Sequence, residues 1–110
     1  MEYVEAARVE EVPLGKGMVF TVADKELAIF NVDGNVYAID NACLHQGLSL
    51  GTSRLDGKIV TCRGHGWRYN VTTGCTLHVP GLGVTTYPVK VVDGKICVAV
   101  GFPRFNPDAV

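Results

Sequence analysis

Residues 62–69 read Cys-Arg-Gly-His-Gly-Trp-Arg-Tyr, and a shorter related stretch, Cys-Leu-His, stands at residues 43–45. Each stretch holds one cysteine and one histidine close together, and residues 46–61 separate the two pairs. Thiolate sulfur and imidazole nitrogen are both common metal ligands. The two stretches therefore supply a candidate four-ligand metal site made of Cys43, His45, Cys62 and His65.

The distribution of these ligands favours a binuclear centre over a single zinc ion. A tetrahedral zinc site with two cysteines and two histidines usually places the cysteines in one turn and the histidines on a helix. Here each stretch offers one of each, which suits two metals, one held by both thiolates and the other by both imidazoles. Gly47, Gly64 and Gly66 would let backbone N–H groups approach inorganic sulfides closely. A zinc site made of the same four residues, or a purely structural role for them, stays an alternative.

Short segments rich in apolar and β-branched residues surround the two stretches and are typical of strands. The predicted strands are Glu2–Val9, Met18–Val22, Glu26–Val32, Val36–Asp40, Lys58–Cys62, Thr85–Val92 and Lys95–Val100. Asp-Gly pairs at residues 33–34, 56–57 and 93–94 predict tight turns, because glycine adopts positive φ without strain. No segment keeps a helical period over ten or more residues. The sequence predicts an all-β fold of short antiparallel strands.

Two long connections and a tail interrupt this pattern. Asn41–Leu55 and Arg63–Gly83 are long for loops of a compact domain, and such loops are usually functional or disordered. Both open at one of the Cys/His pairs, which favours function. The tail Phe102–Val110 contains two prolines, cannot continue a strand and is predicted to lie over the surface.

Length and charge limit the function further. The 110 residues, 11.8 kDa, fit one domain spanning residues 1–110, and 47% hydrophobic residues permit a real core. With 10 basic and 11 acidic residues, the net charge of −1 argues against nucleic acid or an anionic membrane as partner. No apolar run is long enough to span a membrane, and the acidic start does not resemble a signal peptide. We therefore expect a cytoplasmic protein whose cysteines are thiols or metal ligands rather than disulfides.

Together the two stretches resemble the double motif of the Rieske [2Fe–2S] family. The similarity is to the small ferredoxins of bacterial ring-hydroxylating dioxygenases and aromatic monooxygenases. It is most specific in the segment 62–69 and in the Thr73-Gly74 pair that follows, and it extends over nearly the whole chain. Leu44 and Arg63 stand where the family commonly has proline. Neither position supplies a metal ligand, so these departures affect loop stiffness rather than ligation.

The resemblance implies a Rieske-type fold whose cluster-binding subdomain covers about residues 41–83. It also implies that Cys43 and Cys62 hold the inner iron and that His45 and His65 hold the outer, solvent-facing one. The loop at residues 79–83 would then cover a third side of the cluster. Cys75 and Cys97 are expected to be bystanders, Cys97 as a small buried residue of a strand.

The implied function is that of a one-electron carrier rather than an enzyme. It would take electrons from a flavin-dependent reductase and pass them to a terminal ring-hydroxylating oxygenase. Oxygenase chemistry would need a second iron with a two-His-one-carboxylate set, and only His78 remains once the cluster is ligated. Docking is expected near Leu44, Gln46, Arg63, Trp67 and Pro80. Two alternatives are a small Rieske-like subunit of an NADH-dependent nitrite reductase and a zinc-stabilised β-domain that binds a protein partner.

The resemblance also places the reduction potential at the lower end of the family range, at about −150 to −50 mV. Leu48 and Gly64 stand where quinol-oxidising members have a pair of disulfide-forming cysteines. Trp67 stands where those members place a serine hydroxyl on a bridging sulfide. The loss of such a hydrogen bond lowers the potential by roughly 65–130 mV.

Overall fold

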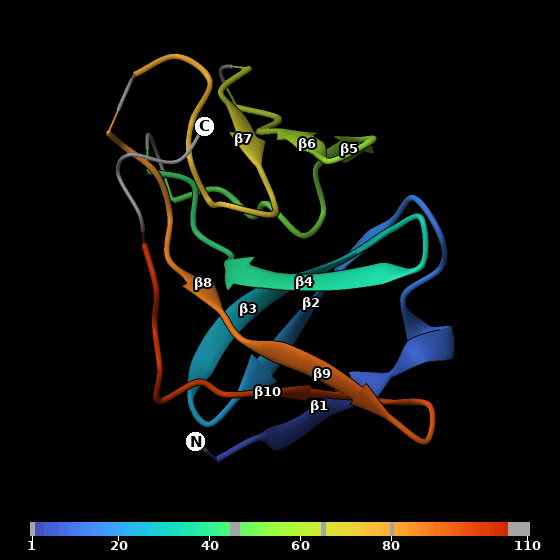
Figure 1. The fold of residues 1–110 in the computed structure, drawn as a ribbon. Coiled ribbons are helices and arrows are strands. Elements are labelled where there is room, and N and C mark those ends of the chain that lie inside the picture. The colour runs from blue at the N-terminus through green and yellow to red at the C-terminus, as the bar shows by residue number, and fades with distance from the viewer. Residues whose placement is uncertain (1, 45–46, 65, 80, 106–110) are drawn as a thin grey trace.

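The computed structural model describes residues 2–44, 47–64, 66–79 and 81–105, which fold almost entirely into strands (Figure 1). Three antiparallel sheets have the strand orders β1-β10-β9, β2-β3-β4-β8 and β5-β6-β7. The strands are β1 (Val4–Arg8), β2 (Gly17–Val22), β3 (Lys25–Val32), β4 (Asn35–Asp40), β5 (Arg54–Asp56), β6 (Ile59–Thr61), β7 (Arg68–Asn70), β8 (Thr86–Tyr87), β9 (Val89–Val92) and β10 (Lys95–Val98). A single 3-10 turn, η1 (Val9–Glu11), follows β1.

The four-stranded sheet forms the middle of the molecule, because its strand β3 is covered on both faces. Residues 27–30 are fully buried although successive side chains of a strand point to opposite faces. Leu27 and Ile29 belong to the core shared with β1 and β10, whereas Ala28 and Phe30 belong to the core beneath β5–β7. A strand covered on both faces reads as a continuous apolar run.

The small sheet β5-β6-β7 stands apart at one end of the molecule (Figure 1). Leu55, Val60 and Tyr69 are direct cross-strand partners in it. Val60 and Tyr69 are fully buried in the core beneath the sheet, and Leu55 packs against that core. One face of this sheet is therefore fixed to the rest of the fold, and the other carries the exposed side chains of Arg54, Asp56 and Arg68.

Two of the predicted Asp-Gly turns have the backbone that their sequence demands. Asp33 and Gly34 have φ values of 53° and 92°, and Asp93 and Gly94 have values of 51° and 77°. Positive φ at both central residues characterises the tight turn that matches strand twist. These turns join β3 to β4 and β9 to β10, so the prediction of both hairpins is confirmed.

The prediction of the all-β class is confirmed, but three strand assignments were wrong. The single strand expected at Thr85–Val92 is divided at Pro88, so that β8 pairs with β4 and β9 pairs with β10. Proline has no N–H to donate to a neighbouring strand, which explains the break. The connections at residues 41–55 and 63–83 also contain strand residues, since β5 begins at Arg54 and β7 lies wholly within the second.

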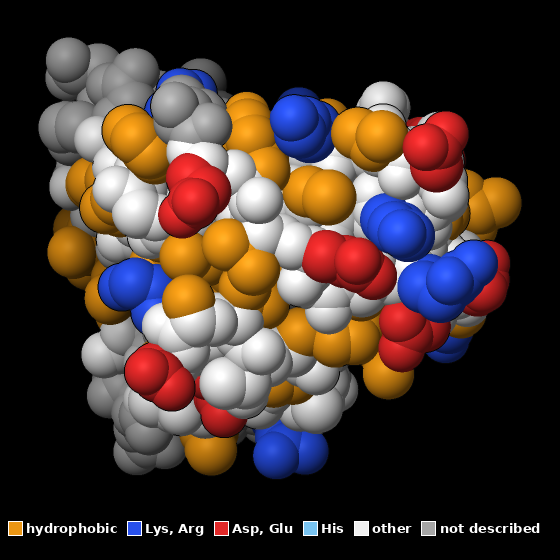
Figure 2. Space-filling view, turned by 90° about the horizontal axis from the view of Figure 1, so that it is seen from below, with side chains coloured by type: hydrophobic (Ala, Val, Ile, Leu, Met, Phe, Trp, Pro, Cys, Tyr) orange, Lys and Arg blue, Asp and Glu red, His pale blue; other side chains and the backbone are white. Residues whose placement is uncertain are grey.

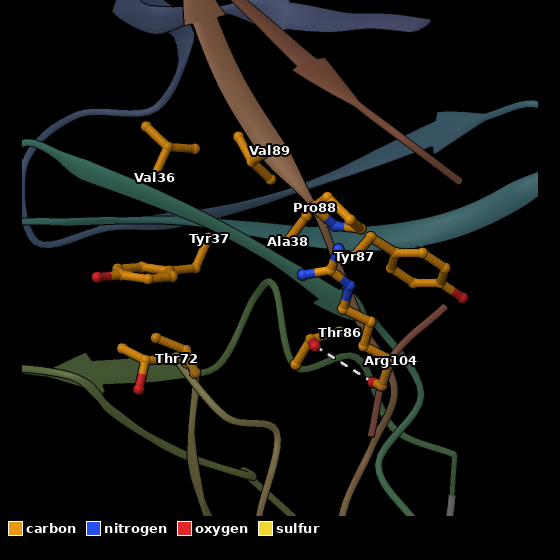
Figure 3. A pocket seen from close by; sticks show the side chains of 10 residues that line it. Val36, Tyr37, Ala38, Thr72, Thr86, Tyr87, Pro88, Val89 and Arg104 are labelled. Atoms are coloured by element: carbon orange, nitrogen blue, oxygen red, sulfur yellow. Dashed lines mark hydrogen bonds between the residues drawn. The ribbon is translucent and has the colours of Figure 1, made fainter. Parts of the chain in front are cut away.

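The described part of the tail lies beside β8 and pairs with it at one point. Thr86 and Arg104 exchange backbone hydrogen bonds of 2.8 Å in both directions and form an isolated antiparallel bridge. Arg104 lines a hollow of about 250 Å³ together with residues of β4, β8 and β9. Figure 3 shows these side chains. Residues 102–105 form no strand of their own and are exposed, as the sequence predicts, and the bridge to Thr86 is a contact that the sequence does not indicate.

Candidate metal centre

Cys43 begins a tight turn just after β4. Its carbonyl accepts a hydrogen bond of 2.7 Å from the amide of Gly47, and its own amide donates to the carbonyl of Leu48 at 2.9 Å. Ala42 and Ser49 form an antiparallel bridge outside this turn. These bonds fix the Cys43 side chain at the base of the loop, where its exposed fraction is only 2%.

Cys62 begins a second turn with the same hydrogen-bond pattern, directly after β6. Gly66 donates to the carbonyl of Cys62 at 3.1 Å, and Cys62 donates to the carbonyl of Trp67 at 2.7 Å. Gly47 and Gly66, four residues after their cysteines, have φ values of 68° and 75°. The left-handed backbone strains other residue types, so each glycine permits its turn to close. The two cysteines thus occupy equivalent places in two equivalent loops.

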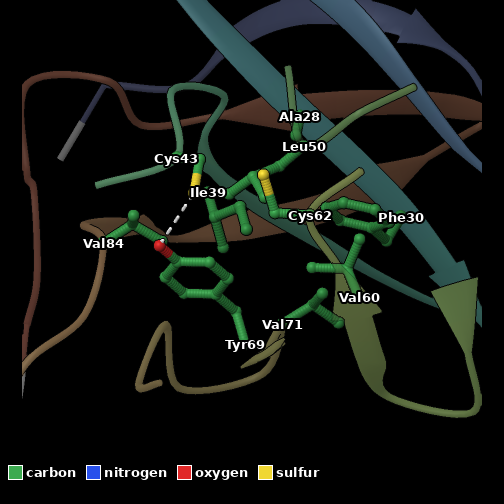
Figure 4. Close-up of a cluster of buried hydrophobic side chains, with 10 residues drawn as sticks. All are labelled: Ala28, Phe30, Ile39, Cys43, Leu50, Val60, Cys62, Tyr69, Val71 and Val84. Carbon is green, nitrogen blue, oxygen red and sulfur yellow. Dashed lines mark hydrogen bonds between the residues drawn. The ribbon is translucent and has the colours of Figure 1, made fainter. Parts of the chain in front are cut away.

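Both cysteines point into the same buried cluster (Figure 4). Cys62 is as buried as Cys43, with 2% exposure, and Tyr69 from β7 lies in that cluster with no exposed surface. Two thiols from separate loops therefore face one region of the core at the end of the small sheet. This is the donor set that a cluster held between two loops requires from its cysteine side.

The Tyr69 hydroxyl connects the small sheet to the first loop. Its oxygen lies 3.2 Å from the Cys43 sulfur and accepts a hydrogen bond of 3.1 Å from the Leu44 amide. Burial and the bond with Cys43 raise the pKa of Tyr69 well above its usual value, and the charges of Cys43 and Cys62 add to the rise. Tyr69 therefore stays a neutral phenol that keeps its proton for a hydrogen bond.

Asn41 holds the first loop on the central sheet. Its side-chain oxygen accepts bonds from the Gly51 amide at 2.7 Å and the Ser49 hydroxyl at 3.1 Å. Its amide group donates to Glu26 at 2.7 Å. The sequence analysis did not single out Asn41, and its only signal there is its position two residues before the first cysteine.

A close contact between two glycines anchors the loop that follows β7. A Cβ atom on Gly74 would lie 2.1 Å from the carbonyl oxygen of Val84, and one on Gly83 would lie 2.3 Å from the carbonyl oxygen of Gly74. Gly83 also forms an antiparallel bridge with Cys75, which is buried. The two ends of the segment from Gly74 to Gly83 are thereby held together beside the small sheet.

The tip of this segment and the first loop expose apolar side chains. Leu44, Leu77, Val79 and Leu82 are 45%, 47%, 42% and 38% exposed. Trp67 is half-buried, and its ring centroid lies 6.1 Å from that of His78. Of the residues expected at the docking surface, Leu44 and Arg63 are exposed, whereas Gln46 and Pro80 lie outside the described residues.

His45 and His65 also lie outside the described residues, so the structure places only the two cysteines of the four candidate ligands. Within the described part of the chain, no group of three or more His, Cys, Asp or Glu side chains forms a metal site. The thiol half of the site nevertheless fits a binuclear iron centre, because the two cysteines are buried, equivalent and directed into one cluster. Cys97, expected to be buried, is only half-buried on β10.

The fold and the paired turns define a small all-β protein built to hold a metal centre between two loops. Residues 2–88 match the family model described as the Rieske [2Fe-2S] domain. The chain belongs to this family, whose cofactor is the [2Fe–2S] cluster.

The similar proteins include ferredoxins, some of them named as components of dioxygenase systems. The chain is 34% identical over 98 residues to the ferredoxin component of a naphthalene 1,2-dioxygenase system from Pseudomonas aeruginosa, covering 88% of this chain and 94% of the relative. The ferredoxin of Sphingomonas yanoikuyae B1 has a TM-score of 0.81 at 31% identity, over 88% and 97% of the two chains. A chain in the complex of reduced oxygenase and oxidised ferredoxin of carbazole 1,9a-dioxygenase has a TM-score of 0.82 at 26% identity, over 94% and 97%.

These relatives favour the ferredoxin interpretation over the nitrite reductase subunit and the zinc-stabilised domain. They are electron-transfer components and not the catalytic oxygenases of their systems. The described residues contain no helix long and apolar enough to cross a membrane.

Proposed function

We propose that this chain is a one-electron carrier that receives electrons from a flavin-dependent reductase and delivers them to a terminal ring-hydroxylating oxygenase. The equivalence of the Cys43 and Cys62 turns, which bring two buried thiols to one core, carries this proposal. Its relatives serve dioxygenase systems in this position. The cytoplasm, where thiols stay reduced, is the compartment that fits such a carrier.

Cys43, His45, Cys62 and His65 are the proposed ligands, in one domain spanning residues 1–110 whose cluster-binding part covers about residues 41–83. When bound, the [2Fe–2S] cluster supplies a one-electron couple. The chain's own residues provide its surroundings. Cys43 and Cys62 exclude water at the inner side, because both are almost fully buried. Tyr69, as a neutral phenol, offers a hydrogen bond to the Cys43 sulfur.

The exposed rim is the proposed place of electron exchange. Leu44, Leu77, Val79 and Leu82 give it exposed apolar area. Small interfaces of this kind suit partners that must dissociate after each electron. Docking near Leu44, Gln46, Arg63, Trp67 and Pro80 therefore stays the prediction for the oxygenase.

The experiment is reconstitution of the chain with ferrous iron and sulfide under anaerobic conditions. We expect a red-brown protein with a [2Fe–2S] stoichiometry and, after reduction, a rhombic EPR signal typical of mixed Cys and His ligation. Cys43→Ser and Cys62→Ser should each abolish the visible absorbance. Cys97→Ser on β10 should retain it and serves as the matched control. A colourless protein that binds one zinc ion would refute the proposal.

A further inference from the structure

The outer face of the small sheet carries a row of arginines. Arg54 on β5 is the cross-strand partner of Thr61 on β6, and Thr61 is the partner of Arg68 on β7. Both arginines are exposed. Their inward-facing neighbours Leu55 and Tyr69 pack in or against the core, so Arg54 and Arg68 point to solvent from the opposite face.

This row lies directly beside the second cysteine loop. A hollow of about 540 Å³ is lined by Arg54, Asp56, Thr61, Cys62, Arg63 and Gly66. Arg54 and Arg68 stand two strand spacings apart, about 10 Å, with Thr61 between them. Arg63 lies in the second cysteine loop, next to Cys62, and adds a second positive charge to the lining of the hollow.

No carboxylate of the described chain neutralises these arginines by an ion pair. The only salt bridge among the described residues joins Arg8 to Glu10 on another part of the molecule. Asp56 is the one acidic residue lining the hollow. The opposite face of the molecule, seen in Figure 2, instead mixes charges of both signs with apolar patches.

We propose that Arg54, Arg63 and Arg68 form a docking surface for an acidic protein partner, which places carboxylates against this side of the cluster loops. The guanidinium group binds carboxylate through two parallel hydrogen bonds, so a row of arginines fits carboxylates on a protein surface. A partner held there lies against the loop that begins at Cys62. The proposal rests on the proposed electron-carrier function and names the surface chemistry of one of its partners.

The first test measures electron transfer from the reduced holoprotein to small oxidants of opposite charge. Each step moves one electron from the protein to ferricyanide, which becomes ferrocyanide, or to hexaammineruthenium(III), which becomes the ruthenium(II) ion. Arg54→Gln and Arg68→Gln should each slow the reaction with ferricyanide about threefold at low ionic strength and should not slow the reaction with the cation. Lys95→Gln on β10 is the matched control and should change neither rate.

The outcomes separate this proposal from the function on which it rests. If reconstitution yields a protein that holds no [2Fe–2S] cluster, the proposed function is refuted. A protein with its cluster whose variants react with ferricyanide at the original rate overturns the docking surface. Equal slowing with both oxidants also overturns it, because that result indicates a changed cluster rather than a changed surface charge.

The second test uses a fluorescein-labelled hexaglutamate peptide, whose binding to the holoprotein is followed by anisotropy. The affinity should fall severalfold in Arg54→Gln and in Arg68→Gln and stay unchanged in Lys95→Gln. Inorganic phosphate should displace the peptide no better than chloride at the same ionic strength. Specific displacement by phosphate would instead indicate a small-anion site and overturn the assignment of a protein partner, as would equal affinity of all variants.

Discussion

The hydroxyl oxygen of Tyr69 lies 3.2 Å from the sulfur of Cys43, and the same oxygen accepts a hydrogen bond from the Leu44 amide. A metal-bound cysteine is a thiolate and has no proton to donate. Because the amide of Leu44 already donates to the phenol oxygen, the tyrosine proton is directed to the sulfur. The Tyr69 hydroxyl therefore donates a hydrogen bond to the sulfur of Cys43, a ligand of the proposed cluster.

Tyr69→Phe should lower the reduction potential of the reconstituted protein. Reduction adds negative charge to the cluster, and a hydrogen-bond donor to the sulfur stabilises this charge. Loss of the Tyr69 hydroxyl should therefore lower the reduction potential by up to roughly 65–130 mV. Protein-film voltammetry or a dye-mediated titration measures the shift. Tyr3→Phe, whose ring centroid lies 4.5 Å from the Lys90 ammonium on β9, is the matched control and should leave the potential unchanged. An unaltered potential in Tyr69→Phe would show that the phenol does not interact with the cluster.

Gly74→Ala should destabilise the protein strongly. Gly74 has a φ of 81°, and an added Cβ would lie 2.1 Å from the Val84 carbonyl oxygen. Backbone strain and a clash with main-chain atoms together should reduce the free energy of unfolding by about 3 kcal/mol or more. Gly57 also has a positive φ, 61°, but faces open space, so Gly57→Ala should cost only about 1 kcal/mol. Urea denaturation followed by circular dichroism compares them, and equal losses would contradict the steric argument.

The sequence predicts the two cysteine loops and the long strands well, and the reason is local. Two kinds of signal are local. The glycine four residues after each cysteine and the Asp-Gly pair of each of the two hairpins each determine a turn of six residues or fewer. Strand β3 is recognisable because its apolar run is continuous. The parts that were not predicted are segments too short to show a pattern of their own, which become strands through pairing with a neighbour.

The three-residue strands β5 and β7 illustrate this limit. Each is too short to show alternation, and each becomes a strand only through pairing with β6. The alignment of Arg54 with Arg68 and the contact of Gly74 with Val84 follow from such pairings. The division of the expected strand Thr85–Val92 at Pro88, in contrast, could have been predicted from the sequence, because proline is disfavoured inside a paired strand.

The stability of the protein should fall in alkali through Tyr87. Its hydroxyl donates to Asp40 at 2.7 Å, and burial, followed by the bond and charge of Asp40, raises the pKa of Tyr87 well above its usual value of 10.0. Below pH 10 the phenol is protonated in both states and its contribution is complete. Above pH 10 the unfolded chain loses this proton first, so the free energy of unfolding falls by about 1.4 kcal/mol per pH unit from this group.

Urea midpoints between pH 8 and 11 measure this dependence. Tyr87→Phe should be less stable at pH 8, because it leaves Asp40 without its donor, but should lose less stability as the pH rises. The original protein, measured over the same pH range, supplies the reference slope. The same slope in Tyr87→Phe would assign the alkaline loss to other groups.

Asn41 should be the most sensitive polar residue of the first loop, since it is 2% exposed and bonds to both the loop and the central sheet. Asn41→Ala removes the acceptor of the Gly51 amide, which is buried, and the donor to Glu26. Unsatisfied buried groups cost about 1–3 kcal/mol each, so we expect a loss of about 2–4 kcal/mol in the free energy of unfolding. Because the loop presents Cys43, the variant should also release iron faster to a chelator.

Asn41→Asp distinguishes the two halves of this network. The new carboxylate still accepts a hydrogen bond from the backbone amide of Gly51. Its second oxygen, however, replaces the side-chain amide nitrogen that donated to the Glu26 carboxylate at 2.7 Å. Two carboxylates in this contact repel each other when both are ionised, so the variant should lose more stability at pH 7 than at pH 4.5. Adding Glu26→Gln restores a donor opposite the carboxylate and should recover most of the loss at pH 7. If the double variant is no more stable than Asn41→Asp alone at that pH, the bond to Glu26 does not hold the loop.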